Sequence, residues 1–215
     1  LMALNKLKFN SLNVTPTADK TIGFNSSADG LEATFSGGAM TFISKSTASS
    51  SSNISFTSGI DSTYKEYLFI FKDIHPGTNE VTFRVNFSID SGSNYNVAKT
   101  GTNFYAGHTE GDATGFGAPG GQQLGQATGK AYVILGDMGS GNDETCAGYF
   151  HLFNPSSTTF VKHWIGTATM YGSNPQSQVT YSAGYANTTS AIDAIQFSMS
   201  SGNIDAGTIT LYGIN

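Results

Sequence analysis

Apolar and polar residues alternate along most of the chain beyond residue 54, which is the period of a β-strand with one face in the core and the other in water. Residues 80–90 (EVTFRVNFSID) follow this pattern most clearly. Their apolar side chains all fall on one face: Val81, Phe83, Val85, Phe87 and Ile89. The alternation predicts a half-buried strand over this segment.

The preceding segment, residues 64–74 (YKEYLFIFKDI), is apolar on both faces over residues 67–71. A strand of this kind is expected at the centre of a structure, covered on two sides. Residues 75–79 (HPGTN) are typical of a turn, because Pro, Gly and Asn favour the backbone angles that turns require. We therefore predict a β-hairpin over residues 64–89.

Shorter segments with strand-like patterning follow at close spacing: residues 131–135, 148–153, 159–171, 178–186, 194–199 and 208–212. Residues 154–157 (NPSS) predict a second hairpin between two of them. A helical period is hard to find, and residues 187–193 are the one segment in which we expect a short helical turn. The predicted fold is all-β: an antiparallel β-sandwich, jelly-roll-like, with a short N-terminal arm.

The N-terminal quarter of the chain differs from the rest. Weak strand signals around residues 7–14 and 39–43 are followed by residues 44–53 (SKSTASSSSN), a polar stretch typical of an exposed linker or long loop. Two interpretations stay open: an arm that packs on a partner, or two edge strands of the same sandwich. We expect residues 1–52 to form this arm or edge with its linker, and residues 53–215 to form the sandwich domain.

A glycine-rich segment lies near the middle of the chain. Residues 107–129 (GHTEGDATGFGAPGGQQLGQATG) contain eight glycines and few apolar residues, and we expect a long loop there. Loops longer than about 12–15 residues tend to be functional or disordered. We expect this one to face outward.

The charge content argues against a nucleic-acid binder. Only 12% of the residues are charged and the net charge is −5, whereas globular domains average about 25% charged residues. Ten Lys and Arg residues, of which Arg84 is the only arginine, form no basic run. Binding several phosphates requires a concentrated basic patch.

The single cysteine and the lack of long apolar runs indicate in which compartment we expect the protein. Cys146 is alone, so no disulfide forms within the chain, and stability has to come from burial or oligomerisation. Residues 1–9 (LMALNKLKF) are not typical of a secretion signal, and no run approaches the roughly 18 apolar residues of a membrane span. We expect a protein that is made in a cytoplasm and does not insert into a membrane.

The candidate motifs for ligand and metal binding are weak. Residues 125–131 (GQATGKA) lack the first glycine and the final Ser or Thr of a phosphate-binding loop. Residues 108–112 (HTEGD) carry metal-ligand types, but one flexible pentapeptide seldom supplies a preorganised site. Residues 90–94 and 137–144 carry oxygen ligands around glycines, which suits calcium or turns at strand ends equally well.

No arrangement of residues indicates catalysis. His151 and His163 flank the second predicted turn, but there is no nucleophile elbow (G-x-S-x-G), and Cys146 has no evident activating partner. We expect a protein that is not an enzyme, with no catalytic residues, no cofactor and no metal. A polysaccharide depolymerase, which requires two convergent acids in a cleft, is an alternative.

Several aromatic residues lie in or beside polar, Gly-rich segments: Tyr95, Tyr105, Phe116, Tyr171, Tyr181 and Tyr185. Such rings suit carbohydrate contact, because the apolar face of a sugar stacks on a ring while neighbouring polar groups bind its hydroxyls. Tyrosine is equally at home at a subunit interface, which is the interpretation we favour. For the carbohydrate alternative, the candidate outward ligand contacts are Tyr105, His108 and Phe116.

Three segments resemble a family of small structural proteins encoded by marine tailed bacteriophages. They are residues 4–27 (LNKLKFNSLNVTPTADKTIGFNSS), 148–163 (GYFHLFNPSSTTFVKH) and 187–214 (NTTSAIDAIQFSMSSGNIDAGTITLYGI). The last is the most telling, with a strand, an SSGNIDAG turn and a closing strand that ends in LYGI. Family members are virion components, variously tail-fibre, decoration or uncharacterised structural proteins, so the resemblance implies a virion protein and no catalytic residues.

We therefore expect a non-enzymatic structural protein exposed on a bacteriophage particle, as a capsid decoration or a tail appendage subunit. Its expected partners are copies of itself, in a homo-oligomer expected to be a trimer, and other phage capsid or tail proteins. The candidate attachment residues in the N-terminal segment are Leu7, Phe9, Leu12 and Val14. The alternative is a carbohydrate-binding, receptor-recognition module of a tail fibre, whose partner is a host surface glycan.

Overall fold

The computed structural model describes residues 21–24, 27, 29–35, 39–129 and 131–215. The chain divides into two compact units, Leu1–Ala39 and Met40–Asn215. In the first unit, β1 (Thr21–Phe24) pairs antiparallel with β2 (Leu31–Phe35). The strand predicted at residues 7–14 lies outside the described residues.

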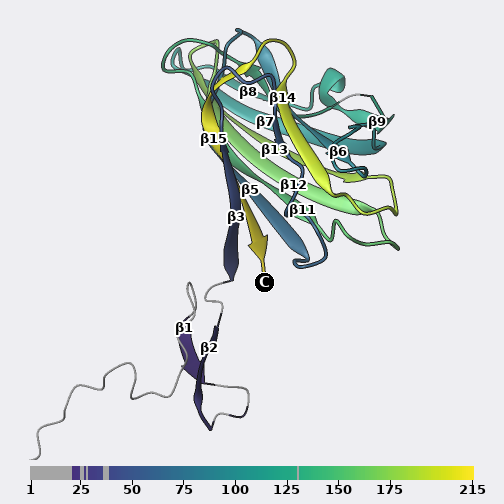
Figure 1. Cartoon of the computed structure of the whole chain (residues 1–215). Helices are drawn as coiled ribbons and strands as arrows, with labels where there is room; N and C mark the ends of the chain where they lie inside the picture. The colour runs from purple at the N-terminus through teal and green to yellow at the C-terminus, as the bar shows by residue number, and fades with distance from the viewer. Residues whose placement is uncertain (1–20, 25–26, 28, 36–38, 130) are drawn as a thin grey trace, which may run out of the picture. The chain divides into compact units, whose positions relative to one another are not determined.

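The second unit is an antiparallel β-sandwich of two sheets, as the alternation predicts (Figure 1). The large sheet has nine strands in the order β3-β15-β5-β11-β12-β13-β7-β8, with β9 also paired to β7. Its strands are β3 (Met40–Thr47), β5 (Glu66–Pro76), β7 (Lys99–Thr109), β8 (Thr114–Gly117), β9 (Leu124–Ala127), β11 (Cys146–Phe153), β12 (Lys162–Tyr171), β13 (Gln176–Ala186) and β15 (Ile204–Ile214).

The small sheet has four strands in the order β10-β6-β14-β4. They are β4 (Ile54–Phe56), β6 (Val81–Ser88), β10 (Tyr132–Met138) and β14 (Ala194–Met199). The jelly-roll connectivity stays a prediction.

The hydrophobic core lies between the two sheets. The predicted inward residues of β6 are buried: Val81, Phe83, Val85 and Phe87. Ile89 is 41% exposed, because the strand ends at Ser88. Rings of the two sheets meet across the core, as where Phe71 of β5 lies 5.2 Å from Phe83 with the ring planes at 88°. Such edge-to-face contacts add to the free energy gained by burying the rings.

The predicted hairpin over residues 64–89 is wrong. β5 pairs with β11 and β15 in the large sheet, whereas β6 pairs with β10 and β14 in the small sheet. Residues 77–80 therefore carry the chain from one sheet to the other. The two strands stack through Phe71 and Phe83 instead of pairing side by side, because each has a large apolar face to bury. The second predicted hairpin is confirmed, since β11 and β12 pair along their length.

The glycine-rich residues 107–129 do not form the single long loop that was predicted. They hold the end of β7, the strands β8 and β9, and a short 3₁₀ helix at Gly120–Gln122. Both β8 and β9 pair with β7, so backbone hydrogen bonds tie this segment to the large sheet. Glycine gives weak strand signals by itself, which is why the sequence pattern missed these strands.

Two other segments also differ from expectation. Residues 187–193 form no helical turn: the backbone N–H of Ile192 donates to Pro155 and that of Asp193 to Ser88, so bonds to distant segments replace local ones. The polar stretch at residues 44–53 begins as the end of β3, and Ser51 bridges to Ile204. The compact units accordingly divide after Ala39, whereas the sequence placed the division after residue 52.

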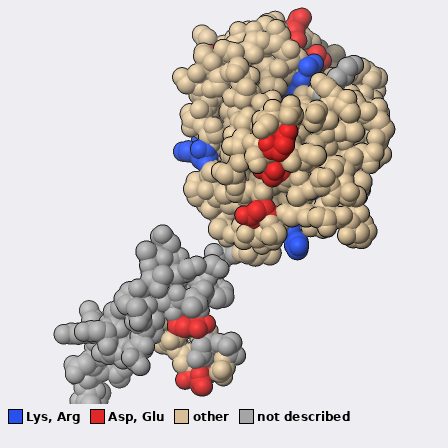
Figure 2. All heavy atoms as spheres, turned by 45° about the vertical axis from the view of Figure 1, so that its right-hand side comes forward, with Lys and Arg blue, Asp and Glu red and all other residues tan. Residues whose placement is uncertain are grey.

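The described surface is sparsely charged. Figure 2 shows one face of the molecule, on which Lys, Arg, Asp and Glu are scattered over a wide uncharged area. Within the described residues, the structure contains no helix long and apolar enough to cross a membrane.

Candidate functional site

The face of the large sheet that points away from the small sheet is mainly apolar and aromatic; we call it the outer face. Residues paired directly across antiparallel strands point to the same side, so the register defines rows that cross the sheet. The first central row contains Met40, Ile214, Glu66, Phe153, His163, Tyr185 and Thr100. The second contains Phe42, Tyr212, Leu68, His151, Ile165, Ala183 and Thr102. The third contains Lys45, Thr210, Ile70, Tyr149, Thr167, Tyr181 and Phe104.

Charge is nearly absent from these three rows. Lys45 and Glu66 are their only Lys, Arg, Asp or Glu residues, and a carboxylate oxygen of Glu66 hydrogen-bonds to Nδ1 of His151 in the next row. A broad sheet face with so little charge is unusual for a surface that contacts only water. The solvent-facing side of an antiparallel sheet normally carries polar residues, and large apolar patches are rare on it. The outer face is therefore the first candidate for a contact surface.

The two sides of the outer face end differently. On the β7 side, β8 and β9 continue the pairing beyond β7. On the other side β3 is an edge strand, and within the described chain no strand pairs with its outer edge. Two large apolar side chains are exposed on β3, Met40 at 44% and Phe42 at 60%, and the Phe42 ring packs edge-on against Tyr212 at 6.0 Å.

The inner strand β5 does not have both of its faces in the core. Tyr67, Phe69 and Phe71 are buried toward the small sheet, as expected. Leu68 and Ile70 point to the outer face and are only partly buried. We predicted that both faces of this strand are covered. Within the described chain, the face with Leu68 and Ile70 is covered only in part.

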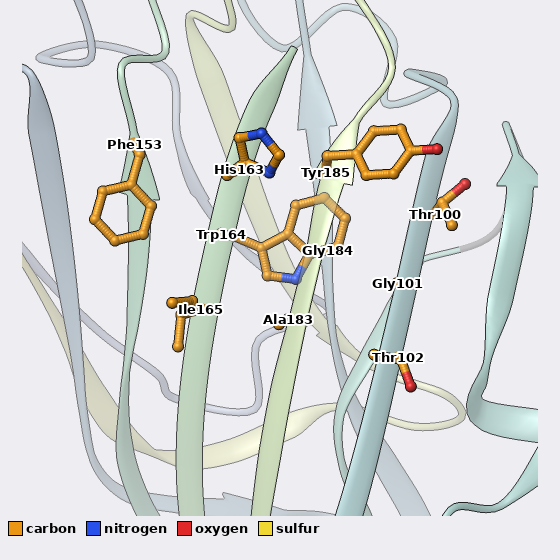
Figure 3. Close-up of a pocket in the computed structure, with 10 residues that line it drawn as sticks. All are labelled: Thr100, Gly101, Thr102, Phe153, His163, Trp164, Ile165, Ala183, Gly184 and Tyr185. Carbon is orange, nitrogen blue, oxygen red and sulfur yellow. The ribbon is translucent and has the colours of Figure 1, made fainter.

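A groove lies on the outer face across β11, β12, β13 and β7 (Figure 3). Its volume is about 520 Å³. The lining residues are Thr100, Gly101, Thr102, Phe153, His163, Trp164, Ile165, Ala183, Gly184 and Tyr185. None of them is an Asp, Glu, Lys or Arg. The rings of Phe153, His163 and Tyr185 follow one another across the strands, and the His163 and Tyr185 rings meet at 6.2 Å with their planes at 61°.

Two glycines beneath the groove leave space for buried aromatic rings. Trp164, Gly184 and Gly101 are paired neighbours on β12, β13 and β7, and the Trp164 ring is buried on the inner side of the sheet. A Cβ on Gly184 would lie 2.3 Å from the indole of Trp164, and one on Gly101 would lie 2.3 Å from Tyr132. The two glycines therefore make room for these rings on the inner side of the sheet, and their backbone forms part of the floor of the groove on the outer side.

Hydrogen bonds organise one end of the groove. Gln126 of β9 donates from Nε2 to Oγ1 of Thr100 at 2.8 Å and to the hydroxyl of Tyr185 at 3.2 Å. Its own Oε1 accepts from Nδ2 of Asn187 at 2.6 Å. This amide therefore fixes a threonine and a tyrosine hydroxyl side by side, which Figure 3 shows at the same end of the groove.

A smaller hollow of about 220 Å³ adjoins the groove. It shares Thr102, Ile165 and Ala183 with the groove and adds Phe104 and Tyr181. The Phe104 and Tyr181 rings are stacked at 5.3 Å with their planes at 22°. The two hollows therefore adjoin at the three shared residues and both have aromatic walls; we call the pair of hollows the depression.

The ligand contacts predicted from sequence are only partly brought together. Phe116 of β8 is 75% exposed on the outer face, where its ring lies 6.0 Å from that of Phe104. His108 is on the same face but contacts Asp112 at 3.1 Å, away from the groove. Tyr105 points to the opposite side of the sheet, where its ring packs over Gly115 and Gly117.

The N-terminal attachment residues predicted from sequence, Leu7, Phe9, Leu12 and Val14, lie outside the described residues. Tyr185 and His163 were candidates from the sequence, but nothing in it indicated that they lie together, and no sequence signal pointed to Phe153, Gln126 or Thr100. No local pattern joins these residues, because the consecutive strands β11, β12 and β13 meet β7, which lies far away in the sequence, at the groove.

Two side chains outside the groove that could react as nucleophiles, Cys146 and Lys162, are buried. Cys146 is buried, and burial raises the pKa of its thiol far above the usual range, which keeps it protonated and unreactive. Lys162 is buried and donates from Nζ to the carbonyl of Thr188 at 2.9 Å, and burial lowers its pKa. Among the described residues, no three His, Cys, Asp or Glu side chains are grouped so that they could hold a metal ion.

Comparison with known proteins gave no match to a protein-family model, to a curated protein or to a solved structure.

Proposed function

We propose that this protein is a non-enzymatic structural subunit of a bacteriophage particle, and that it assembles with copies of itself, as a trimer, through one part of its outer face. That part, the assembly patch, consists of Met40, Phe42, Leu68, Ile70 and Tyr212. Its place is on the outside of the virion, as a capsid decoration or a tail appendage. The family resemblance of the sequence supports the phage particle, and the outer face supports the assembly.

The observation that carries the proposal is the exposure of large apolar side chains beside an open sheet edge. Phe42 is 60% exposed on β3, next to Tyr212 and the partly buried Leu68. Edge strands are normally protected by charge, proline or cover, because an open edge attracts other chains. Here Lys45 is the only charged side chain of β3. A second copy covering this patch would bury the apolar side chains and protect the edge.

The assembly is tested by measuring the mass of the protein in solution. We expect the parent protein to sediment as a trimer and Phe42→Ser to sediment as a monomer, because the serine removes the largest exposed apolar contact of the patch. Phe116→Ser is the matched control: it removes an equally large and even more exposed phenylalanine on the β7 side of the same face. We expect this variant to remain a trimer. A monomeric parent protein, or equal dissociation in both variants, would overturn the assembly patch.

The place on the particle is tested separately. Mass spectrometry of gradient-purified particles of the phage that encodes this chain should find it in a fixed ratio to the major capsid protein. Deleting residues 1–24, which include the candidate attachment residues Leu7, Phe9, Leu12 and Val14, should abolish incorporation and leave the sandwich folded. Normal incorporation of the shortened chain would refute the attachment role, and particles that lack the intact chain would refute the virion role.

A further inference from the structure

We propose that the groove between Phe153 and Tyr185, together with the adjoining hollow at Phe104 and Tyr181, binds a neutral oligosaccharide. This inference goes beyond the assembly role and does not depend on it, since the groove and the assembly patch share no residue.

The walls of the depression present ring faces. Phe153, His163 and Tyr185 lie in one row, and the stacked rings of Phe104 and Tyr181 lie in another. The row between them contains Ile165, which is 51% exposed, and the smaller Ala183 and Thr102. A pyranose has one face of C–H groups that packs on an aromatic ring. Beside Ile165, the small side chain of Ala183 leaves a space between the two groups of rings in which a flat ligand can lie.

Polar groups stand at one end of the depression. The hydroxyls of Thr100 and Tyr185 both accept a hydrogen bond from Nε2 of Gln126, and each hydroxyl keeps its own proton to donate. Asn187 in turn holds the Gln126 amide in place. Two preorganised donors beside an aromatic ring match the hydroxyl groups that surround the apolar face of a sugar.

The lack of charge selects the class of ligand. The residues of the groove and of the adjoining hollow include no Asp, Glu, Lys or Arg. A sulfated or carboxylated sugar would lose its hydration here without gaining a cationic partner, which is costly. A neutral sugar loses only neutral hydrogen bonds, and the hydroxyls of the groove replace some of them.

The shape favours a chain of sugars over a second protein molecule. The two hollows, of about 520 and 220 Å³, adjoin at Thr102, Ile165 and Ala183, so that sugars linked in a chain could occupy both. An apolar protein surface laid over the depression would leave the Thr100 and Tyr185 hydroxyls without new partners, which is unfavourable for buried polar groups. An oligosaccharide satisfies both the rings and the hydroxyls.

The first test uses the full-length protein, in whatever oligomeric state it adopts, on an array of neutral, sialylated and sulfated oligosaccharides. We expect binding to one or more neutral oligosaccharides that is retained at 0.5 M NaCl. The strongest neutral oligosaccharide is then titrated calorimetrically. No neutral oligosaccharide bound above background, or a preference for the charged ones, would overturn the proposal.

Variants locate the site on the same oligosaccharide. Tyr185→Ala and Phe153→Ala should each weaken binding at least tenfold, and Tyr185→Phe, which keeps the ring and loses the hydroxyl, should weaken it about threefold. The matched control is Tyr149→Ala, an exposed tyrosine of the outer face that lines neither hollow; we expect its affinity to match the parent. Circular dichroism of each variant checks that the fold is kept, and the milder Tyr185→Phe keeps the test valid if an alanine variant unfolds.

Two results would show that the groove has another occupant. Binding unchanged by Tyr185→Ala and Phe153→Ala would place the sugar elsewhere. A trimer that dissociates in Tyr185→Ala but not in Phe42→Ser would assign the groove to a second copy of the chain. The parent protein could also prove to be a monomer that binds the sugar, with binding lost in Tyr185→Ala. That result would refute the assembly proposal and support the groove assignment.

Discussion

Two buried lysines lie at one end of the sandwich core. Lys162 of β12 and Lys99 of β7 both pair with Ala186 of β13, and both are fully buried on the inner side of the large sheet. Removing an ammonium group from water favours its neutral form, so burial lowers the pKa of Lys99 to about 8. Burying these ammonium groups therefore lowers the free energy of unfolding at neutral pH. Hydrogen bonds, such as that from Lys162 Nζ to the carbonyl of Thr188, offset part of the loss.

The lysine at position 99 should make stability depend on pH in the alkaline range. Between about pH 8 and its ordinary pKa of 10.5, the unfolded chain keeps the proton that the folded chain has released. At this position the unfolded state then binds more protons, so Lys99 contributes a rise of about 1–3 kcal/mol to the free energy of unfolding across this window. The Cys146 thiol, whose pKa burial raises, contributes an opposing fall near pH 10, because the unfolded thiol loses its proton first. Urea unfolding at pH 7.5 and pH 10 should therefore show a change in the free energy of unfolding that is more positive in the parent protein than in Lys99→Met.

An exposed lysine supplies the control for this prediction. Lys45→Met removes an exposed lysine from β3, and its free energy of unfolding should change with pH as that of the parent protein does. Equal pH dependence in the parent and in Lys99→Met would contradict the assignment to Lys99.

At the scale of the elements, the pairing of β15 with β5 contains an irregularity of register. The register shifts between Ala206 and Thr208, opposite Asp73 and Ile74. Gly207 has φ +111° and Asp73 has φ +52°, both in the left-handed region that favours glycine. A bulge of this kind increases the local twist, which helps a wide sheet to curve over a smaller one.

Gly207→Ala should therefore destabilise the sandwich. The new Cβ would lie 2.4 Å from the carbonyl oxygen of Asp73 and 2.7 Å from the Cα of Ile74, both backbone atoms that cannot move aside cheaply. We expect the free energy of unfolding in urea to fall by about 1–3 kcal/mol. The control is Gly125→Ala in β9, where no atom lies within 4 Å of the added Cβ, and which we expect to change stability little. A Gly207→Ala variant as stable as the control would show that the bulge relaxes without cost.

The sequence predicts individual strands better than their partners. The alternation in β6 identified its buried face, because the period of two depends only on neighbouring residues. The turn-like residues 75–79 did not reveal whether β5 and β6 pair or stack, since a short connection serves either purpose. The groove was beyond sequence reasoning for the same reason: Phe153, Tyr185 and Thr100 meet only through the register of β11, β12, β13 and β7.

For the whole molecule, the core belongs to one compact unit. All the residues of the main hydrophobic cluster, from Ala48 to Leu211, lie within Met40–Asn215. Both sheets of the sandwich are likewise built from this unit. Residues 40–215 therefore hold the buried area on which folding depends.

The segment of residues 40–215 should fold when produced alone. We expect its far-ultraviolet circular dichroism to show β-structure and its thermal unfolding to be a single transition within about 3 °C of that of the full chain, because the core is unchanged. A broad transition, or a loss of more than about 10 °C, would mean that the first unit contributes to the stability of the sandwich.

The tryptophan beneath the glycine floor gives the molecule a built-in optical reporter. Trp164 is the only tryptophan of the chain, its indole is buried against Phe87 and Tyr132, and it also lines the groove from below. Anything that settles on the two glycines changes the polarisability of the medium a few ångströms from the fluorophore. Binding in the groove should therefore shift the fluorescence emission of Trp164 in the unlabelled protein. The Tyr185→Ala and Phe153→Ala variants should weaken that shift at a given ligand concentration.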